Sequence, residues 1–126
     1  KQMQKTLKPA DLPHIVMISV DPQRDTIKRL RDYVTEFNPA FRGARGDLKH
    51  LMQLSKQMHV VFTKIAANDG NKNHYTISHT AEIMVVDPQG KLIAYLGYPH
   101  EATKMAHDYH AITTAYAASQ KKDDIV

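Results

Sequence analysis

The sequence predicts an α/β domain with a mainly parallel sheet, an antiparallel edge and flanking helices. Apolar runs of strand length alternate with segments whose apolar residues recur at helical spacing. Two strand–turn–strand patterns then follow one another, which adds hairpins to the parallel part. The hydrophobic content of 42% in 126 residues is high enough for the core of one domain or part of one.

The first two elements are expected to be the end of a helix and a buried strand. Residues 1–8 have no initiator methionine and look like the last turns of a helix, so we expect the chain to be cut at its N-terminus. Residues 14–20 form a nearly continuous apolar run, which is typical of a strand covered on both faces of a parallel sheet. The dipeptide Asp21-Pro22 ends this run.

Two capped helices follow, separated by a short glycine-containing segment at 41–46 that we expect to be an edge strand. Asp25 or Thr26 can cap the first helix, and Asn38-Pro39 ends it. Asp47 caps the second helix. Their apolar stripes are Ile27, Leu30, Val34 and Phe37 in the first helix, and Leu48, Leu51, Met52 and Met58 in the second. Because the methionines alternate with leucines along this stripe, we expect them to be core residues rather than copper ligands.

The second half of the chain predicts two hairpins and a last helix. Residues 60–65 and 75–77 are expected strands around a polar loop, and 82–86 and 92–96 are strands joined by the turn Asp87-Pro-Gln-Gly90. The last helix is expected to place Met105, Tyr109, Ile112 and Tyr116 on one face. We therefore predict one partial domain over residues 1–118 and a charged tail over 119–126.

Composition excludes several classes of function for the chain as given. The net charge is +4, but Lys and Arg are spread over helix faces without interleaved aromatic residues, which argues against a nucleic-acid surface. No apolar run is long enough to span a membrane. The absence of cysteine excludes disulfides, thiol catalysis and cysteine metal sites. His107 and His110 lie three apart without a suitably spaced further ligand, so we expect surface histidines.

One histidine, His79, stands directly before the apolar strand 82–86. A histidine at the mouth of a strand has fixed backbone geometry and can point into a site built by other segments. It can equally be a structural histidine whose ring nitrogens are satisfied by hydrogen bonds.

Three separated segments together resemble the Sco/SenC family. They are Ile18-Ser-Val-Asp-Pro-Gln-Arg-Asp-Thr26, then Tyr33-Val-Thr-Glu-Phe-Asn-Pro39, and Tyr75-Thr-Ile-Ser-His-Thr80 with Val86-Asp-Pro-Gln-Gly90. The resemblance runs in order from about residue 2 to about residue 117. It implies a thioredoxin-like sheet flanked by helices, here lacking its N-terminal strands.

The resemblance also implies a copper site. A Cys-x-x-x-Cys motif should lie just upstream of Lys1, and His79 should be the third ligand. Two thiolates and one imidazole suit Cu(I) and can also hold Cu(II). With only one of the three ligands, the chain as given is not expected to hold copper tightly. Asp21 matches a family aspartate that could shape the mouth of the site, although an Asp-Pro turn explains it equally well. Ser78 stands where the family usually has an acidic residue, which affects how His79 would be oriented.

The implied function is that of a copper metallochaperone for assembly of the copper site of cytochrome c oxidase. Its partner would be the copper-bearing oxidase subunit or another copper chaperone, and the full-length protein could also act as a thiol–disulfide reductase. The family is usually anchored to a membrane and faces the periplasm or the mitochondrial intermembrane space. The alternatives are a thiol peroxidase or oxidoreductase with the same fold, and an interaction module that has lost the site.

The resemblance places the missing strand between strands 14–20 and 82–86. We therefore expect that the chain needs its upstream segment, another chain or a rearranged sheet in order to fold.

Overall fold

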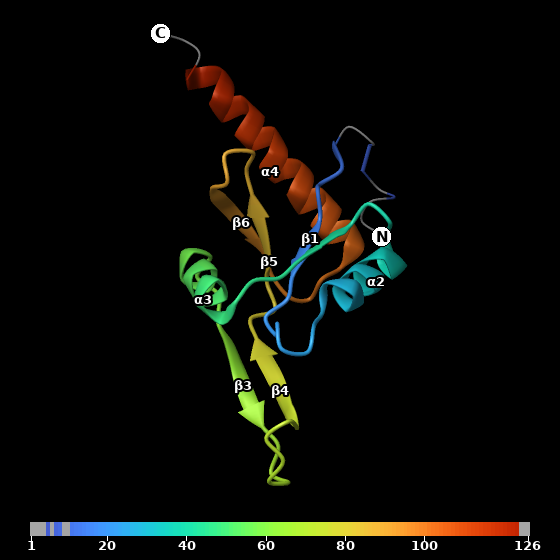
Figure 1. Ribbon diagram of the computed structural model, residues 1–126. Coiled ribbons are helices and arrows are strands. Elements are labelled where there is room, and N and C mark those ends of the chain that lie inside the picture. The colour runs from blue at the N-terminus through green and yellow to red at the C-terminus, as the bar shows by residue number, and fades with distance from the viewer. Residues whose placement is uncertain (1–4, 6, 9–10, 124–126) are drawn as a thin grey trace. The chain divides into compact units, whose positions relative to one another are not determined.

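A computed structural model describes residues 5, 7, 8 and 11–123 of the chain (Figure 1). The helix end predicted at residues 1–8 therefore lies largely outside the described residues. The chain divides into two compact units, His14–Ala81 and the pair of segments Lys1–Pro13 and Glu82–Val126. The prediction of one partial domain over residues 1–118 stays a prediction.

The first unit begins with a parallel β–α–β arrangement. Strand β1 (Val16–Ile18) pairs in parallel with β2 (Arg42–Ala44), and helix α2 (Ile27–Phe37) connects them. This confirms the predicted edge strand and the predicted helix. The Thr26 side chain caps α2 by accepting from the backbone N–H of Arg29, and Asn38 ends the helix.

Helix α2 packs closely on β2 through Leu30 and Val34, its two buried residues. A Cβ atom at Gly43 would lie 2.6 Å from Cγ of Leu30, so the helix can approach the strand this closely only because residue 43 has no side chain. The predicted stripe of α2 is therefore correct in its centre. Its outer members, Ile27 and Phe37, are exposed.

Helix α3 (Leu48–Gln57) begins, as predicted, at Asp47, whose side chain accepts from the backbone N–H of His50. The prediction that its whole apolar stripe lies in the core is wrong. Leu51 is buried, but Leu48 and Met52 are 57% and 50% exposed. The physical reason is that the described residues of this unit cover only the middle of the stripe.

The rest of the first unit is an antiparallel hairpin of β3 (Phe62–Ala66) and β4 (Tyr75–His79). The register pairs Phe62 with His79 and Ala66 with Tyr75, so β4 extends two residues beyond the strand predicted from the sequence. Thr80 closes the open end of the hairpin: its hydroxyl accepts from the N–H of Val61 at 2.7 Å and its own N–H donates to the Val61 carbonyl.

The second unit contains the predicted hairpin of β5 (Ile83–Val86) and β6 (Leu92–Leu96), with an irregularity at Val85/Val86. Asp87 holds the turn, because its Oδ1 accepts from the N–H groups of Gln89 and Lys91. Gly90 has φ of 84°, in the left-handed region that glycine adopts without strain.

The last helix, α4 (Ala102–Asp123), belongs to the same unit. Ala106 is buried, and the four predicted face residues are half-buried, namely Met105, Tyr109, Ile112 and Tyr116. The Tyr116 hydroxyl donates to Oε1 of Gln89 in the hairpin turn. Helix α4 continues through residues 119–123, which include no glycine or proline to stop it. The charged tail over residues 119–126 stays a prediction. Residues 124–126 lie outside the described set.

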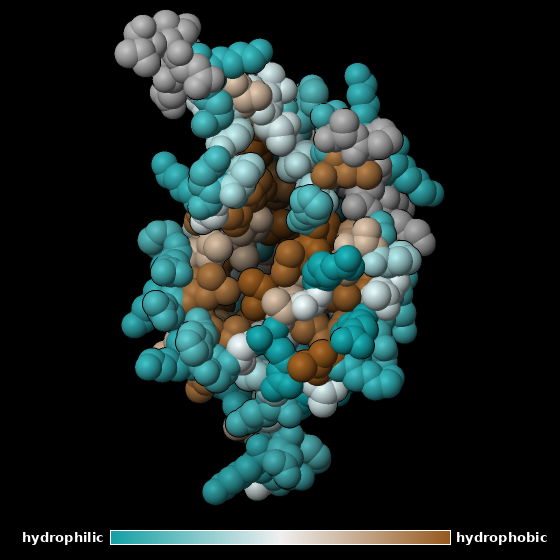
Figure 2. Space-filling model, turned by 45° about the horizontal axis from the view of Figure 1, so that its top comes forward, coloured by the Kyte–Doolittle hydropathy of each residue, from teal (hydrophilic) through white to brown (hydrophobic). Residues whose placement is uncertain are grey.

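The described strands form three separate two-stranded sheets rather than one continuous sheet. The prediction that strands 14–20 and 82–86 are buried on both faces is wrong for the structure as it stands. Val16, Met17 and Ile18 of β1 are all exposed, and so are Ile83 and Val86 of β5. Apolar side chains accordingly reach the surface in Figure 2. A strand with a single paired neighbour leaves its other edge and much of its apolar surface uncovered. The expectation that further chain is needed to complete the fold stays a prediction.

Candidate metal site and its surroundings

His79 is the last residue of β4 and its side chain is exposed. Its Nδ1 lies 2.8 Å from the carbonyl oxygen of Thr80. Because a carbonyl can only accept, Nδ1 carries the hydrogen and the lone pair of the neutral ring lies on Nε2. Histidines that bind metals usually donate their other ring N–H to such an acceptor. The local geometry therefore leaves Nε2 of His79 available as a ligand atom.

The donors of the described chain do not by themselves fit a three-ligand copper site. The sequence contains no cysteine, and the residues that the structure describes include no group of three or more His, Cys, Asp or Glu side chains able to hold a metal ion. A single exposed imidazole supplies one ligand, so the remaining ligands of any copper site have to come from outside these residues.

Ser78 and Asp21 take different positions around β4. Ser78 precedes His79 and pairs with Thr63, and the pleat directs its side chain to the opposite face from His79. Asp21 is buried and belongs to the turn after β1, because its carbonyl accepts from the N–H groups of Arg24 and Asp25. The roles of Ser78 and Asp21 in shaping a metal site stay predictions.

The Asp21 carboxylate is tied to the beginning of β4. Its Oδ1 accepts from the Tyr75 hydroxyl at 2.8 Å, and its Oδ2 accepts from Nε of Arg24 in a short ion pair. Tyr75 and His79 are the first and last residues of the strand, about 13 Å apart along it. The structure therefore connects Asp21 to the strand that carries His79, but at the strand's other end.

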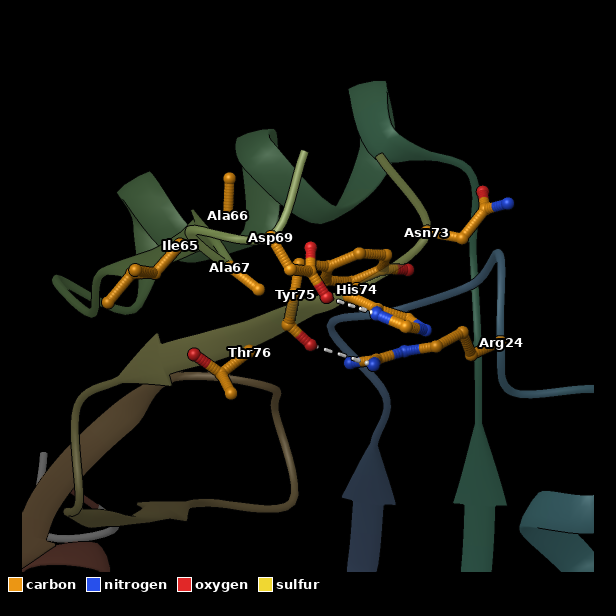
Figure 3. A pocket seen from close by; sticks show the side chains of 9 residues that line it. All are labelled: Arg24, Ile65, Ala66, Ala67, Asp69, Asn73, His74, Tyr75 and Thr76. Atoms are coloured by element: carbon orange, nitrogen blue, oxygen red, sulfur yellow. Dashed lines mark hydrogen bonds and ion pairs between the residues drawn. The ribbon is translucent and has the colours of Figure 1, made fainter. Parts of the chain in front are cut away.

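The sequence did not predict two further candidate functional residues, Arg24 and Tyr75. Figure 3 shows the Arg24 guanidinium directed at the start of β4, where Nη1 donates to the Tyr75 carbonyl at 2.9 Å. The same guanidinium lies 3.9 Å from the centre of the Tyr75 ring, and Nζ of Lys64 lies 3.6 Å from it. Arg24 and Tyr75 line an open pocket together with the Asp69–His74 pair of the β3–β4 loop.

The contacts of Asp21 shift its pKa. Burial alone would raise the pKa of this carboxyl group, but the hydrogen bonds from Arg24 and Tyr75 and the charge of Arg24 outweigh burial and lower it. Burial and the hydrogen bond to Asp21 raise the pKa of the Tyr75 hydroxyl. Asp21 is thus held ionised and Tyr75 protonated, which keeps the hydrogen bond between them in place around neutral pH.

The lowered pKa of Asp21 makes stability depend on acid pH. The unfolded protein, in which the Asp pKa is about 3.9, binds more protons than the folded protein as the pH falls below about 5. The stabilisation that ionised Asp21 contributes is therefore complete above about pH 5. It is lost as the pH falls through the pKa of Asp21 in the folded protein. Asp21→Asn is expected to lower the free energy of unfolding by about 1.5–3 kcal/mol near neutral pH.

Urea unfolding of the purified protein near neutral pH and near pH 3 would measure this effect. The loss of stability between the two pH values is expected to be smaller in Asp21→Asn than in the wild type. Asp32→Asn, which changes an exposed aspartate paired with Lys28 on α2, is the matched control. An equal acid loss in the wild type and in Asp21→Asn would contradict the role given to Asp21.

Together, the described elements and the exposed histidine at the end of β4 define a mixed α/β protein with one candidate metal ligand. A family model described as SCO1/SenC matches residues 1–114. The chain belongs to this family.

Relatives and solved structures support the assignment. The chain is 27% identical over 112 residues to "Protein sco1" of Schizosaccharomyces pombe, covering 89% of this chain and 41% of that protein. It is 31% identical over 85 residues to a "Putative copper-binding protein" of Stutzerimonas stutzeri, covering 68% and 40%. The structure of Arabidopsis thaliana ScoI with copper bound superposes with a TM-score of 0.76 at 22% identity, covering 91% of this chain and 68% of that one.

These comparisons confirm the predicted thioredoxin-like α/β fold and the resemblance to the Sco/SenC family. The chain spans about two fifths of the length of the curated relatives named above. Relatives from Arabidopsis, human and Saccharomyces cerevisiae are named as mitochondrial proteins. Within the described residues, no helix combines the length and the apolar character that crossing a membrane requires.

Proposed function

We propose that the full-length protein is a copper metallochaperone that delivers copper to the copper-bearing subunit of cytochrome c oxidase. The observation that carries this proposal is the exposed imidazole of His79, whose Nδ1–H donates to the Thr80 carbonyl and whose Nε2 is left as the ligand atom. The chain's membership of the SCO1/SenC family and its similarity to a putative copper-binding protein of Stutzerimonas stutzeri support the same cargo.

The chemistry of delivery needs a site that holds copper firmly and still gives it up. His79 would supply one ligand at the open end of a hairpin, and two thiolates from outside the given chain would complete a set suited to Cu(I). Because the histidine is exposed, an incoming ligand of the recipient protein can reach the metal from solvent. The same thiols, when free of metal, could exchange with disulfides. We place this protein at the periplasmic side of an inner membrane or in the mitochondrial intermembrane space.

Copper transfer from the loaded full-length protein tests the proposal. The acceptor is the soluble, metal-free copper domain of the oxidase subunit, whose absorption spectrum changes as it takes up the metal. We expect the full-length protein to bind one copper ion and to pass it to this domain, while the metal-free protein produces no change. Failure to bind copper would overturn the proposal. Thiol-dependent consumption of peroxide without copper transfer would favour a thiol peroxidase instead.

A further inference from the structure

Two residues, Arg24 and Tyr75, connect the hairpin that carries His79 to the β1–α2 connection. We propose that they are positioning residues for the metal ligand: they fix β4, and through it they fix the place of the His79 imidazole. This inference rests on the proposed function, because it assigns to Arg24 and Tyr75 a role in copper binding through His79.

Three contacts of different kinds converge on Tyr75. Arg24 donates to the backbone carbonyl of Tyr75 at 2.9 Å, which holds the strand itself and not only a side chain. The Arg24 guanidinium also lies 3.9 Å from the centre of the Tyr75 ring. The Tyr75 hydroxyl donates to the buried Asp21 carboxylate at 2.8 Å. Arg24, Asp21 and Tyr75 together are called the β4 clamp below.

The segment that carries Asp21 and Arg24 is itself fixed by further hydrogen bonds. Arg45, just after β2, donates to the carbonyl of Pro22 at 2.7 Å. The Ser19 hydroxyl accepts from the N–H of Asp21 at 3.1 Å and donates to the Asp25 carboxylate. The segment from Ser19 to Asp25 is therefore fixed from both sides, so that the clamp attaches β4 to a well-anchored part of its unit.

The path from Tyr75 to His79 is one paired strand. Every residue of β4 has a partner in β3, from Ala66 opposite Tyr75 to Phe62 opposite His79. Residues 75, 77 and 79 of a strand point to the same face, so Tyr75 and His79 share one side of the hairpin. The bonds between Thr80 and Val61 close the hairpin upon itself without attaching it to β1 or α2. Movement at Tyr75 would therefore be passed along the strand to His79.

A ligand side chain that is already fixed raises the affinity for the metal. Less conformational entropy is then lost when the metal binds. Residues that only orient a metal ligand typically change metal affinity by about 10–100-fold. The clamp acts at the far end of the strand from His79. We therefore expect Arg24→Ala to lower the Cu(I) affinity of the full-length protein by about tenfold, at the low end of that range.

A double-mutant cycle on the full-length protein separates this role from general damage to the fold. Cu(I) affinity is measured by competition with a chelator for wild type, Arg24→Ala, His79→Ala and the double variant. Amide hydrogen exchange over β4 is measured in the metal-free proteins. We expect Arg24→Ala to weaken binding and speed exchange in β4, and to cause no further loss of affinity once His79 is alanine. Tyr75→Phe should have a smaller effect in the same direction.

Tyr33→Phe is the matched control, because Tyr33 is a half-exposed tyrosine on α2 whose ring packs edge-on against Phe37. It should change neither affinity nor exchange. Unchanged affinity in Arg24→Ala, together with a large loss in His79→Ala, would overturn the clamp and leave the proposed function standing. An equal loss from Arg24→Ala in both backgrounds would also overturn the clamp. If His79→Ala had no effect, the ligand assignment and the clamp's role in copper binding would both fall.

Discussion

Replacing His79 with alanine is expected to lower the Cu(I) affinity of the full-length protein by more than about 100-fold. A residue that only orients a ligand typically costs about 10–100-fold, and His79 is proposed to be a ligand itself. Its Nδ1–H is already committed to the Thr80 carbonyl, so Nε2 is the atom whose loss matters. Alanine removes this donor but keeps the strand, because the backbone pairing with Phe62 needs no side chain.

The measurement is a competitive titration with a Cu(I) chelator of known affinity. His107→Ala and His110→Ala are matched controls, because both replace an exposed histidine of α4 with the same residue. Both controls are expected to bind copper like the wild type. Unchanged affinity in His79→Ala would show that the ligand assignment is wrong. Losses of similar size in all three variants would show that the histidines contribute without a defined site.

The elements that the sequence specifies locally were predictable. Thr26 and Asp47 cap their helices because a short side-chain oxygen at that position accepts from a backbone N–H three residues on. The turn at Asp87-Pro-Gln-Gly90 follows from the same kind of short-range chemistry, and the hairpin around it formed as expected. In each case the deciding interaction lies within about four residues.

Burial was harder to predict, because it depends on which distant segments cover a surface. The apolar runs of β1 and β5 have the composition of buried strands, yet in the described structure each has a single partner strand and remains exposed. Met52 follows the same logic on α3: its helical spacing is correct, but the described residues leave it half exposed. Periodicity shows which side of an element is apolar, and the neighbours decide whether that side is covered.

The same difference between local and long-range interactions applies to the candidate site. The family resemblance singled out His79, whereas its position before the apolar run 82–86 left it equally a structural histidine, and its role as a ligand stays a prediction. The contact between Asp21 and Tyr75 could not, because it joins residues 54 apart and depends on the register of a hairpin. Two signals pointed toward it: Arg24 lies three residues after Asp21, where a turn brings them together, and a partly buried tyrosine usually finds a partner for its hydroxyl. Neither signal predicts that Asp21 and Tyr75 are each other's partners.

Replacing Leu30 with alanine is expected to cost about 2–5 kcal/mol in the free energy of unfolding. Leu30 is only 5% exposed, and it seats α2 on β2 at the point where Gly43 leaves room for it. Alanine would remove the side chain that fills the space beside Gly43 and would leave a cavity there. The described part of the chain has few other buried apolar side chains, namely Val34, Leu51, Leu96 and Ala106, so the loss is a large share of the buried apolar surface.

Urea unfolding of the full-length protein measures this loss, with Ile27→Ala as the matched control. Ile27 is on the same helix but 62% exposed, so its truncation removes little buried surface and is expected to cost less than about 1 kcal/mol. Equal losses in the two variants would show that α2 is not held on β2 through Leu30. The Thr26 cap of α2 lies two residues after Arg24 of the clamp. Leu30→Ala should therefore also speed amide exchange in β4, whereas Ile27→Ala should not.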